Sequence, residues 1–186
     1  MTRYHRAPIH PALAPYVEEI LIQDSSAPIL PGALRYPVLP RPYPVIGFQY
    51  RGRLGVVRQT GPELLSRSGI TGLQMTARFF EAQPETRSIL VTLKSYGAFA
   101  LFDRPMDDIA GNHVGMDLIA PAASLRSVEE KLAESPSPLR RVQVVSAFLL
   151  KRLEDSRCLP HPVVLEATKR ILNSAGGERI QSLATG

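Results

Sequence analysis

Tryptophan is absent from this chain of 186 residues, and cysteine occurs once. The single cysteine, Cys158, excludes an internal disulfide and favours a reducing compartment, the cytoplasm. No stretch approaches the roughly 18 consecutive apolar residues that a membrane-spanning helix needs. The polar residues 1–6 are not followed by an apolar run, which argues against a signal peptide. We therefore expect a cytoplasmic protein with no membrane partner.

Sequence motifs for catalysis are also missing. The four histidines, His5, His10, His113 and His161, are scattered, and no His-x-His pair is present for a metal site of the cupin kind. The chain has no Gly-x-Ser-x-Gly elbow, phosphate loop or dinucleotide fingerprint. We therefore expect no metal, no cofactor and no enzymatic activity.

The first half of the chain has the pattern of a β-protein. Proline occurs 17 times and glycine 13 times, and they break the sequence into short apolar or alternating runs, as strands and turns do. The predicted strands cover residues 17–23, 44–51, 54–58, 69–74, 77–82 and 87–94. The turn at Arg51-Gly52-Arg53 suits a hairpin between the second and third of these.

Six prolines lie between residues 28 and 44. Because proline donates no hydrogen bond to a sheet, this piece is predicted to be an irregular or edge segment. Pro28 with Pro31, and Pro37 with Pro40, fit P-x-x-P spacing. We prefer the interpretation that this segment is a stiff loop covering the mouth of a barrel. The alternative is a proline-rich segment that recruits a partner.

After Tyr96 the pattern becomes helical, with predicted helices at residues 97–102, 105–110, 122–134, 138–155 and 161–174. Ser137 is a good N-cap with Pro138 at the first helical position. One stripe of the fourth helix carries Val142, Val145, Leu149 and Leu153. The apolar face of the fifth helix carries Val164, Ala167, Thr168, Ile171 and Ala175, and Gly176 is expected to end it as the C′ residue.

The positive charge is concentrated in this helical half. From Pro136 onward the chain has eight Lys and Arg residues against four acidic ones, out of 22 and 17 in the whole chain. A basic end is compatible with proximity to nucleic acid, but charge alone favours an ordinary solvated helix face. The residues thus predict an α+β fold, an antiparallel β-barrel or sandwich followed by helices.

Several stretches resemble the N-terminal regulatory half of AraC-type bacterial transcription regulators. The resemblance lies in Ala14-Pro15-Tyr16-Val17, in Leu39 to Phe48 and in Thr71-Gly72-Leu73-Gln74. It also lies in Leu93 to Pro105 and in Arg179 to Ala184, the last of which resembles the first helix of a helix-turn-helix. Two positions depart from the family pattern: Ser95-Tyr96-Gly97 replaces Pro-Gly-Gly, and Arg41 replaces an aspartate.

This resemblance implies three parts: a β-rich, cupin-like ligand-binding domain at residues 1–95, a helical connector and dimerisation segment at 96–175, and the start of a DNA-binding domain at 176–186. The turn glycine of the first helix-turn-helix would lie beyond Gly186. The resemblance therefore implies that DNA is bound by a C-terminal domain outside this chain, that no residue here contacts a base, and that the protein is a homodimer.

Candidate ligand-binding residues are aromatic and basic side chains of the β half. The aromatic candidates are Tyr36, Tyr43, Phe48, Tyr50 and Phe79, and the basic ones are Arg35, Arg41 and Arg78. Aromatic walls with a few placed charges suit a small anionic or aromatic effector. Two alternatives stay open: these rings fill a packed barrel with no cavity, or the chain is a stand-alone small-molecule-binding barrel or cupin-like enzyme.

Overall fold

The computed structural model describes residues 3–24, 35–105, 107–158 and 160–184, and within them the chain has an α+β fold. Its strands are β1 (Arg3–Ala7), β2 (Val17–Asp24), β3 (Arg35–Val38), β4 (Val45–Arg51), β5 (Leu54–Arg58), β6 (Gly61–Leu64), β7 (Ser68–Thr71), β8 (Arg78–Ala82), β9 (Arg87–Leu93) and β10 (His113–Gly115). Its α-helices are α1 (Gly97–Phe102), α2 (Ala122–Glu134), α3 (Pro138–Asp155), α4 (Pro162–Asn173) and α5 (Ile180–Ala184). Short 3-10 helices are η1 (Pro11–Leu13), η2 (Asp107–Ile109) and η3 (Met116–Leu118).

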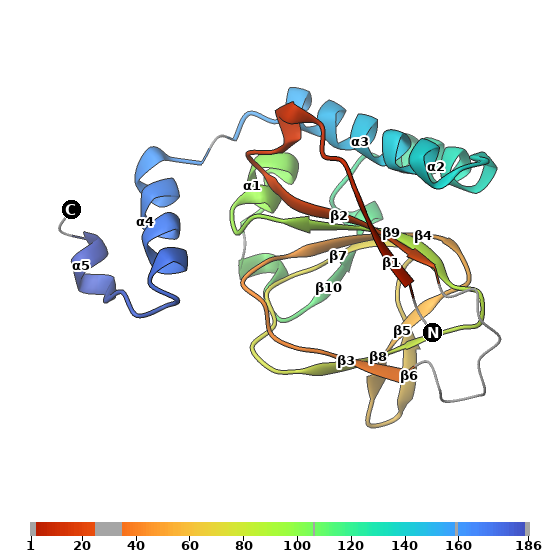
Figure 1. Cartoon of the computed structure of the whole chain (residues 1–186), viewed down its shortest axis with the longest axis horizontal. Coiled ribbons are helices and arrows are strands. Elements are labelled where there is room, and N and C mark those ends of the chain that lie inside the picture. Colours follow the sequence, from red (N-terminus) through yellow and green to blue (C-terminus); the bar gives the residue numbers. More distant parts are fainter. Residues whose placement is uncertain (1–2, 25–34, 106, 159, 185–186) are drawn as a thin grey trace.

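The strands form two antiparallel sheets. One has six strands in the order β1-β2-β9-β4-β7-β10, and the other has four in the order β3-β8-β5-β6. Figure 1 shows helices α2 and α3 over one side of the six-stranded sheet, with the four-stranded sheet on its other side. The six-stranded sheet is therefore the middle layer.

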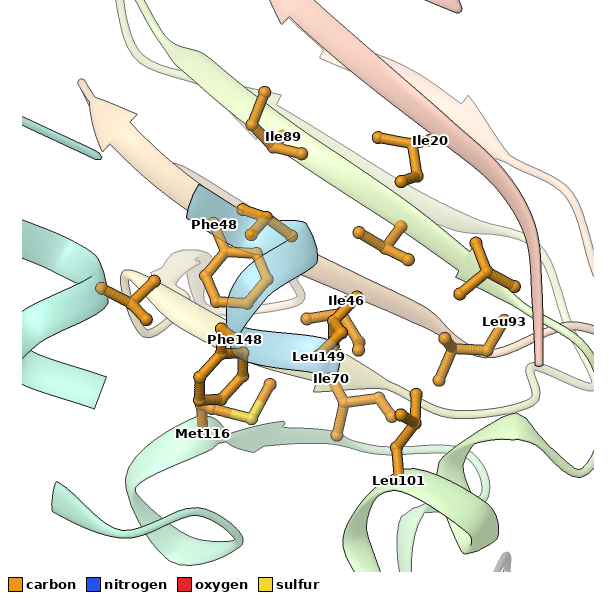
Figure 2. Packing of buried hydrophobic residues seen from close by; sticks show 14 of the residues in the cluster. Ile20, Ile46, Phe48, Ile70, Ile89, Leu93, Leu101, Met116, Phe148 and Leu149 are labelled. Carbon is orange, nitrogen blue, oxygen red and sulfur yellow. The ribbon is translucent and has the colours of Figure 1, made fainter. Parts of the chain in front are cut away.

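The main core lies between the six-stranded sheet and the helices. Alternate residues of β4, β9 and β2 point toward the helices, as the pleat requires. Phe48, Ile46 and Leu149 are completely buried there, and Figure 2 shows them beside Phe148 of α3. A second, smaller core of Val56, Leu65 and Phe80 belongs to the four-stranded sheet and its connections.

The turn at residues 51–53 differs from the predicted hairpin. Strands β4 and β5 do not pair, because β4 belongs to the six-stranded sheet and β5 to the four-stranded one. The turn carries the chain from one sheet to the other, and Gly52 adopts a φ of 61° there. Gln49 supports the crossing, since its Oε1 accepts a hydrogen bond from the Leu54 amide at 2.6 Å.

The prediction for the proline-rich segment is confirmed where the structure describes it. Pro37 lies in β3, an edge strand paired only with β8 among the described strands. Edge strands tolerate proline because one side of their backbone needs no partner. Pro28 and Pro31 lie outside the described residues.

Helices α2 and α3 have the predicted bounds, and Ser137 accepts the Arg140 amide as the N-cap of α3. The predicted stripe is buried at Val142, Val145 and Leu149. The short helix expected at residues 105–110 is the single 3-10 turn η2.

Helix α1 is anchored at its first residue. A Cβ atom at Gly97 would lie 2.4 Å from the Tyr16 carbonyl oxygen, so only glycine fits this close approach. The Tyr96 hydroxyl donates to the Pro15 carbonyl at 3.0 Å. The Ser-Tyr-Gly sequence therefore fixes the start of α1 against the β1–β2 connection.

Helices α4 and α5 stand to one side of the other elements, beyond an extended connection from α3 (Figure 1). We call α4 and α5 the arm. None of the α4 residues is buried. The helix ends one residue earlier than predicted, because Ala175, with a φ of 51°, takes the left-handed C′ position and Gly176 follows it. The Arg170 guanidinium pairs with Glu178 and ties the arm together.

None of the helices in the described part of the chain is both long enough and apolar enough to cross a membrane.

Candidate ligand-binding site

A pocket of about 560 Å³ opens at one edge of the six-stranded sheet, where β1, β2 and the segment before β4 come together. We call it the mouth pocket. Its lining residues are Arg6, Ala7, Ile9, Glu18, Glu19, Ile20, Arg41, Pro42, Tyr43 and Thr92. Two residues predicted from the sequence, Arg41 and Tyr43, are thus brought together in one concavity. The volume is within the range of small-molecule sites.

The mouth pocket carries charges of both signs. Arg6 Nε lies 2.7 Å from Glu19 Oε2, and the Arg6 side chain is 84% exposed while that of Glu19 is 19% exposed. The carboxylate thus lies in the wall, whereas the guanidinium that pairs with it is exposed to solvent. Arg41 makes no hydrogen bond or ion pair with any residue that the structure describes, and its charge lowers the pKa of the nearby Tyr4 against the larger, opposite effect of burial. Arg41 is therefore the cation available to an anionic ligand.

Polar side chains form a row on the sheet face opposite the helices. The register pairs Tyr4 with Gln23, Gln23 with Ser88 and Ser88 with Gln49, so all four project from the same face. Ser88 Oγ donates to Gln23 Oε1 at 2.6 Å, and Gln49 Nε2 donates to the Ser66 carbonyl at 2.8 Å. This face is polar where the helix-covered face is apolar.

Tyr36 of β3 approaches this row from the four-stranded sheet. Burial raises its pKa, and the nearby Tyr4 hydroxyl adds to that rise. The Gln23 side-chain amide lies close enough to lower the pKa of Tyr36, yet its Nε2 has no partner with hydrogen-bond geometry. Gln23 is fully buried, so its Nε2 is a buried donor without a partner among the described residues, beside the Tyr36 hydroxyl.

Three other predicted residues belong to the four-stranded sheet. Arg35 Nε pairs with Glu81 Oε2 at 2.5 Å on the surface, and the Phe79 ring is 53% exposed. The Arg78 guanidinium donates to the Gly111 carbonyl and so connects β8 to the loop before β10. None of the three lines the mouth pocket.

The last two predicted residues face the helices. The Phe48 ring is fully buried and meets the Phe148 ring edge-on, with centroids 5.9 Å apart. The Arg141 guanidinium lies over the Tyr50 ring, 4.3 Å from its centroid, and burial raises the pKa of Tyr50. Both rings pack under α3, on the other face from Tyr36.

The structure brings together one group that the sequence pattern did not predict. His113 Nε2 lies 2.9 Å from Ser66 Oγ, and His113 Nδ1 lies 3.1 Å from Thr71 Oγ1. The His113 ring lies against Gly69. A Cβ atom on that residue would lie 2.5 Å from Nε2. Burial lowers the pKa of His113, against a smaller opposite effect of Glu63. These residues are far apart in sequence and belong to no recognised motif, so only the pairing of β7 with β10 reveals them.

Cys158 follows α3, and the Asp103 carboxylate beside it raises the pKa of the thiol, which disfavours the reactive thiolate. Among the described residues, no three His, Cys, Asp or Glu side chains gather where they would hold a metal ion.

No protein-family model and no curated protein matches this chain. Among solved structures, it is similar to the AraC-like transcriptional activator CuxR, with 14% identity and a TM-score of 0.40 over 89% of this chain and 64% of that one. It is also similar to the EutQ protein of Clostridium difficile, with 12% identity and a TM-score of 0.35 over 53% of this chain and 66% of that one. The chain therefore spans less than two thirds of each. Similarity at this level does not indicate a function.

Proposed function

We propose that this chain is the effector-sensing and dimerisation part of an AraC-type DNA-binding transcription regulator. In this proposal the strands of residues 1–95 form a cupin-like barrel, to whose edge β10 is added. The helices of residues 96–175 connect and dimerise, and residues 176–186 open a DNA-binding domain. The helices that read DNA would lie outside this chain. The effector would be a small anionic molecule with an apolar or aromatic body, bound in the mouth pocket.

The observation that carries the proposal is the setting of Arg41. Its guanidinium lines a concavity without an ion pair among the described residues, beside the Tyr43 ring and Pro42. An unpaired arginine in a partly apolar pocket is suited to bind a carboxylate or phosphate, with the ring and the aliphatic wall contacting the rest of the ligand.

In this proposal the mouth pocket acts on the arm through the main core and α3. Ile9 of the pocket leads into η1, whose Leu13 is fully buried in the main core. Helix α3 contacts both η1 and β2, and it continues through the connection at residues 156–161 into α4. A ligand that moves β1 or η1 would therefore shift α3, which is the mechanical requirement for coupling two sites.

Exposed apolar side chains support the proposed dimer. Ile171 and Leu172 of α4 are 41% and 38% exposed, on a helix that buries none of its residues within this chain. Apolar side chains of this size gain free energy when a second chain covers them.

A thermal-shift screen tests the sensing role. We expect at least one metabolite from a library of small carboxylates and phosphates to raise the melting temperature, because a ligand that binds only the native state stabilises it. Arg41→Ala should abolish that shift. Arg126→Ala removes an exposed arginine on α2 and should leave it unchanged. A shift that survives Arg41→Ala would rule out the mouth pocket as the effector site.

The alternative is a stand-alone small-molecule-binding barrel or a cupin-like enzyme. The Ser66–His113 hydrogen bond favours it, because a histidine can activate a serine hydroxyl as a nucleophile. The second ring nitrogen faces Thr71, however, and a threonine stabilises an imidazolium less than a carboxylate does. Ester hydrolysis that is lost in Ser66→Ala would support this alternative.

A further inference from the structure

A second pocket, of about 390 Å³, lies between α1 and the start of α4. We call it the arm pocket. It is lined by Ser95, Tyr96, Phe99, Pro160, His161, Val164 and Thr168. Figure 1 shows α4 on the far side of α1 from α3, so this is where the arm approaches the rest of the chain.

The arm pocket is uncharged and largely apolar. No Lys, Arg, Asp or Glu lines it, whereas two arginines and two glutamates line the mouth pocket. Its lining includes two aromatic residues, Tyr96 and Phe99, together with Pro160 and Val164. Binding an ion here would cost desolvation energy that no opposite charge would offset, so the fitting ligand is neutral.

Most polar groups of the arm pocket already have partners. Ser95 Oγ donates to the Pro42 carbonyl at 2.9 Å, and Thr168 Oγ1 donates to the Val164 carbonyl at 2.7 Å. The Tyr96 hydroxyl is likewise engaged with Pro15. A ligand therefore does not need to form hydrogen bonds with these three groups.

One donor remains. His161 Nδ1 accepts the Val163 amide at 3.3 Å, so the neutral ring carries its proton on Nε2. That nitrogen has no hydrogen bond with the residues that the structure describes. A ligand with a single acceptor, such as an ether, carbonyl or hydroxyl oxygen, would satisfy it.

The arm buries little of its surface against the rest of the chain. Val164 is 51% exposed although it lines the pocket, and none of the α4 residues is buried. A flat ring between Phe99 and Val164 would bury apolar surface on both sides and join elements that otherwise touch little.

We propose that the arm pocket binds a small uncharged aromatic molecule, which bridges α1 and α4 and fixes the arm against the rest of the chain. This site is separate from the mouth pocket, and the proposal does not depend on the function of the mouth pocket. If both sites are used, the molecule bound here would set how freely α4 and α5 move.

The probe for the test is 6-propionyl-2-(dimethylamino)naphthalene, an uncharged aromatic ketone whose carbonyl oxygen can accept from His161 and whose fluorescence changes in apolar surroundings. We expect saturable binding, weakened about tenfold or more by Val164→Arg, which corresponds to a loss of about 1.4 kcal/mol. Val163→Arg is the matched control, because Val163 is the adjacent α4 residue, is 63% exposed and lies outside the pocket. Arg41→Ala should also leave binding unchanged. Circular dichroism checks that each variant is folded.

Trypsin provides the second readout, since Arg157 lies exposed in the connection between α3 and α4. The bound probe should slow cleavage after Arg157 in the unaltered chain and in Val163→Arg, but not in Val164→Arg. The proposal is overturned if no saturable binding occurs, or if Val163→Arg and Val164→Arg bind equally. Binding that leaves the cleavage rate unchanged would overturn the bridging role, and loss of binding in Arg41→Ala alone would place the probe in the mouth pocket.

Discussion

The Phe148 ring of α3 meets the Phe48 ring of β4 edge-on, at an interplanar angle of 83°. Both rings are buried in the core that joins the helices to the six-stranded sheet. Phe148→Ala should therefore lower the free energy of unfolding by about 3–5 kcal/mol, through lost burial and the cavity left behind. Urea denaturation measures this. Leu139→Ala is the control on the same helix, because Leu139 is 61% exposed, and it should change stability little.

The close approach at Gly72 gives a second prediction. A Cβ atom there would lie 1.9 Å from the Ile109 carbonyl oxygen, and backbone cannot yield as a side chain can. Gly72→Ala should destabilise the chain by about 1–3 kcal/mol or more. At Gly47 the nearest atom to an added Cβ would be a leucine methyl at 3.6 Å, so Gly47→Ala should be tolerated. Equal melting temperatures for the two variants would contradict the close packing of η2 on the residue after β7.

The buried pair of Ser88 and Gln23 allows a double-mutant cycle. Ser88→Ala leaves Gln23 Oε1 without its donor and should cost about 1–3 kcal/mol of stability. The double variant Gln23→Leu with Ser88→Ala removes both hydrogen-bonding side chains. It should lower the free energy of unfolding less than Ser88→Ala alone. Chemical denaturation of the three variants gives the coupling energy. An additive result would mean that the two side chains do not share a hydrogen bond.

His113 should make stability depend on pH. Burial lowers its pKa in the folded chain, so the unfolded chain takes up a proton more readily. Stability is then greatest above the unfolded pKa of about 6.5 and falls as pH decreases through that value toward the folded pKa. His113→Gln should reduce this fall between about pH 7 and pH 5, whereas His5→Gln, at an exposed position, should not. An unchanged pH slope in His113→Gln would show that other groups cause the dependence.

The helices were predictable where their own residues carry the signals. Ser137 with Pro138 marks the start of α3, and the Val142 stripe marks its buried side. Phe148 was missed because it borders that stripe, and only the facing Phe48 makes it a core residue. The apolar stripe of α4 was predicted, but what packs against it was not. No described part of the chain buries it.

The sheets were less predictable, because strand pairing depends on residues far apart in sequence. Strands β1, β6 and β10 were missed; they are short or rich in polar residues, and all lie at sheet edges. The hairpin predicted around Gly52 was wrong since the local turn chemistry does not reveal that the chain changes sheets. For the same reason, the sequence could not show that the candidate ligand-binding residues lie in different places. Arg41 and Tyr43 share a pocket, whereas Phe48 and Tyr36 lie on opposite sides of a sheet.

The most direct test of the regulatory role is duplex-DNA binding by the complete product of this gene. Fluorescence anisotropy would follow its binding to the DNA upstream of its own coding region, with and without the effector found by thermal shift. We expect salt-dependent binding, because phosphate contacts release counterions. We also expect the effector to change the affinity in the unaltered protein and not in Arg41→Ala. A complete product that binds no duplex DNA at low salt, or one whose DNA affinity the effector leaves unchanged, would contradict the account.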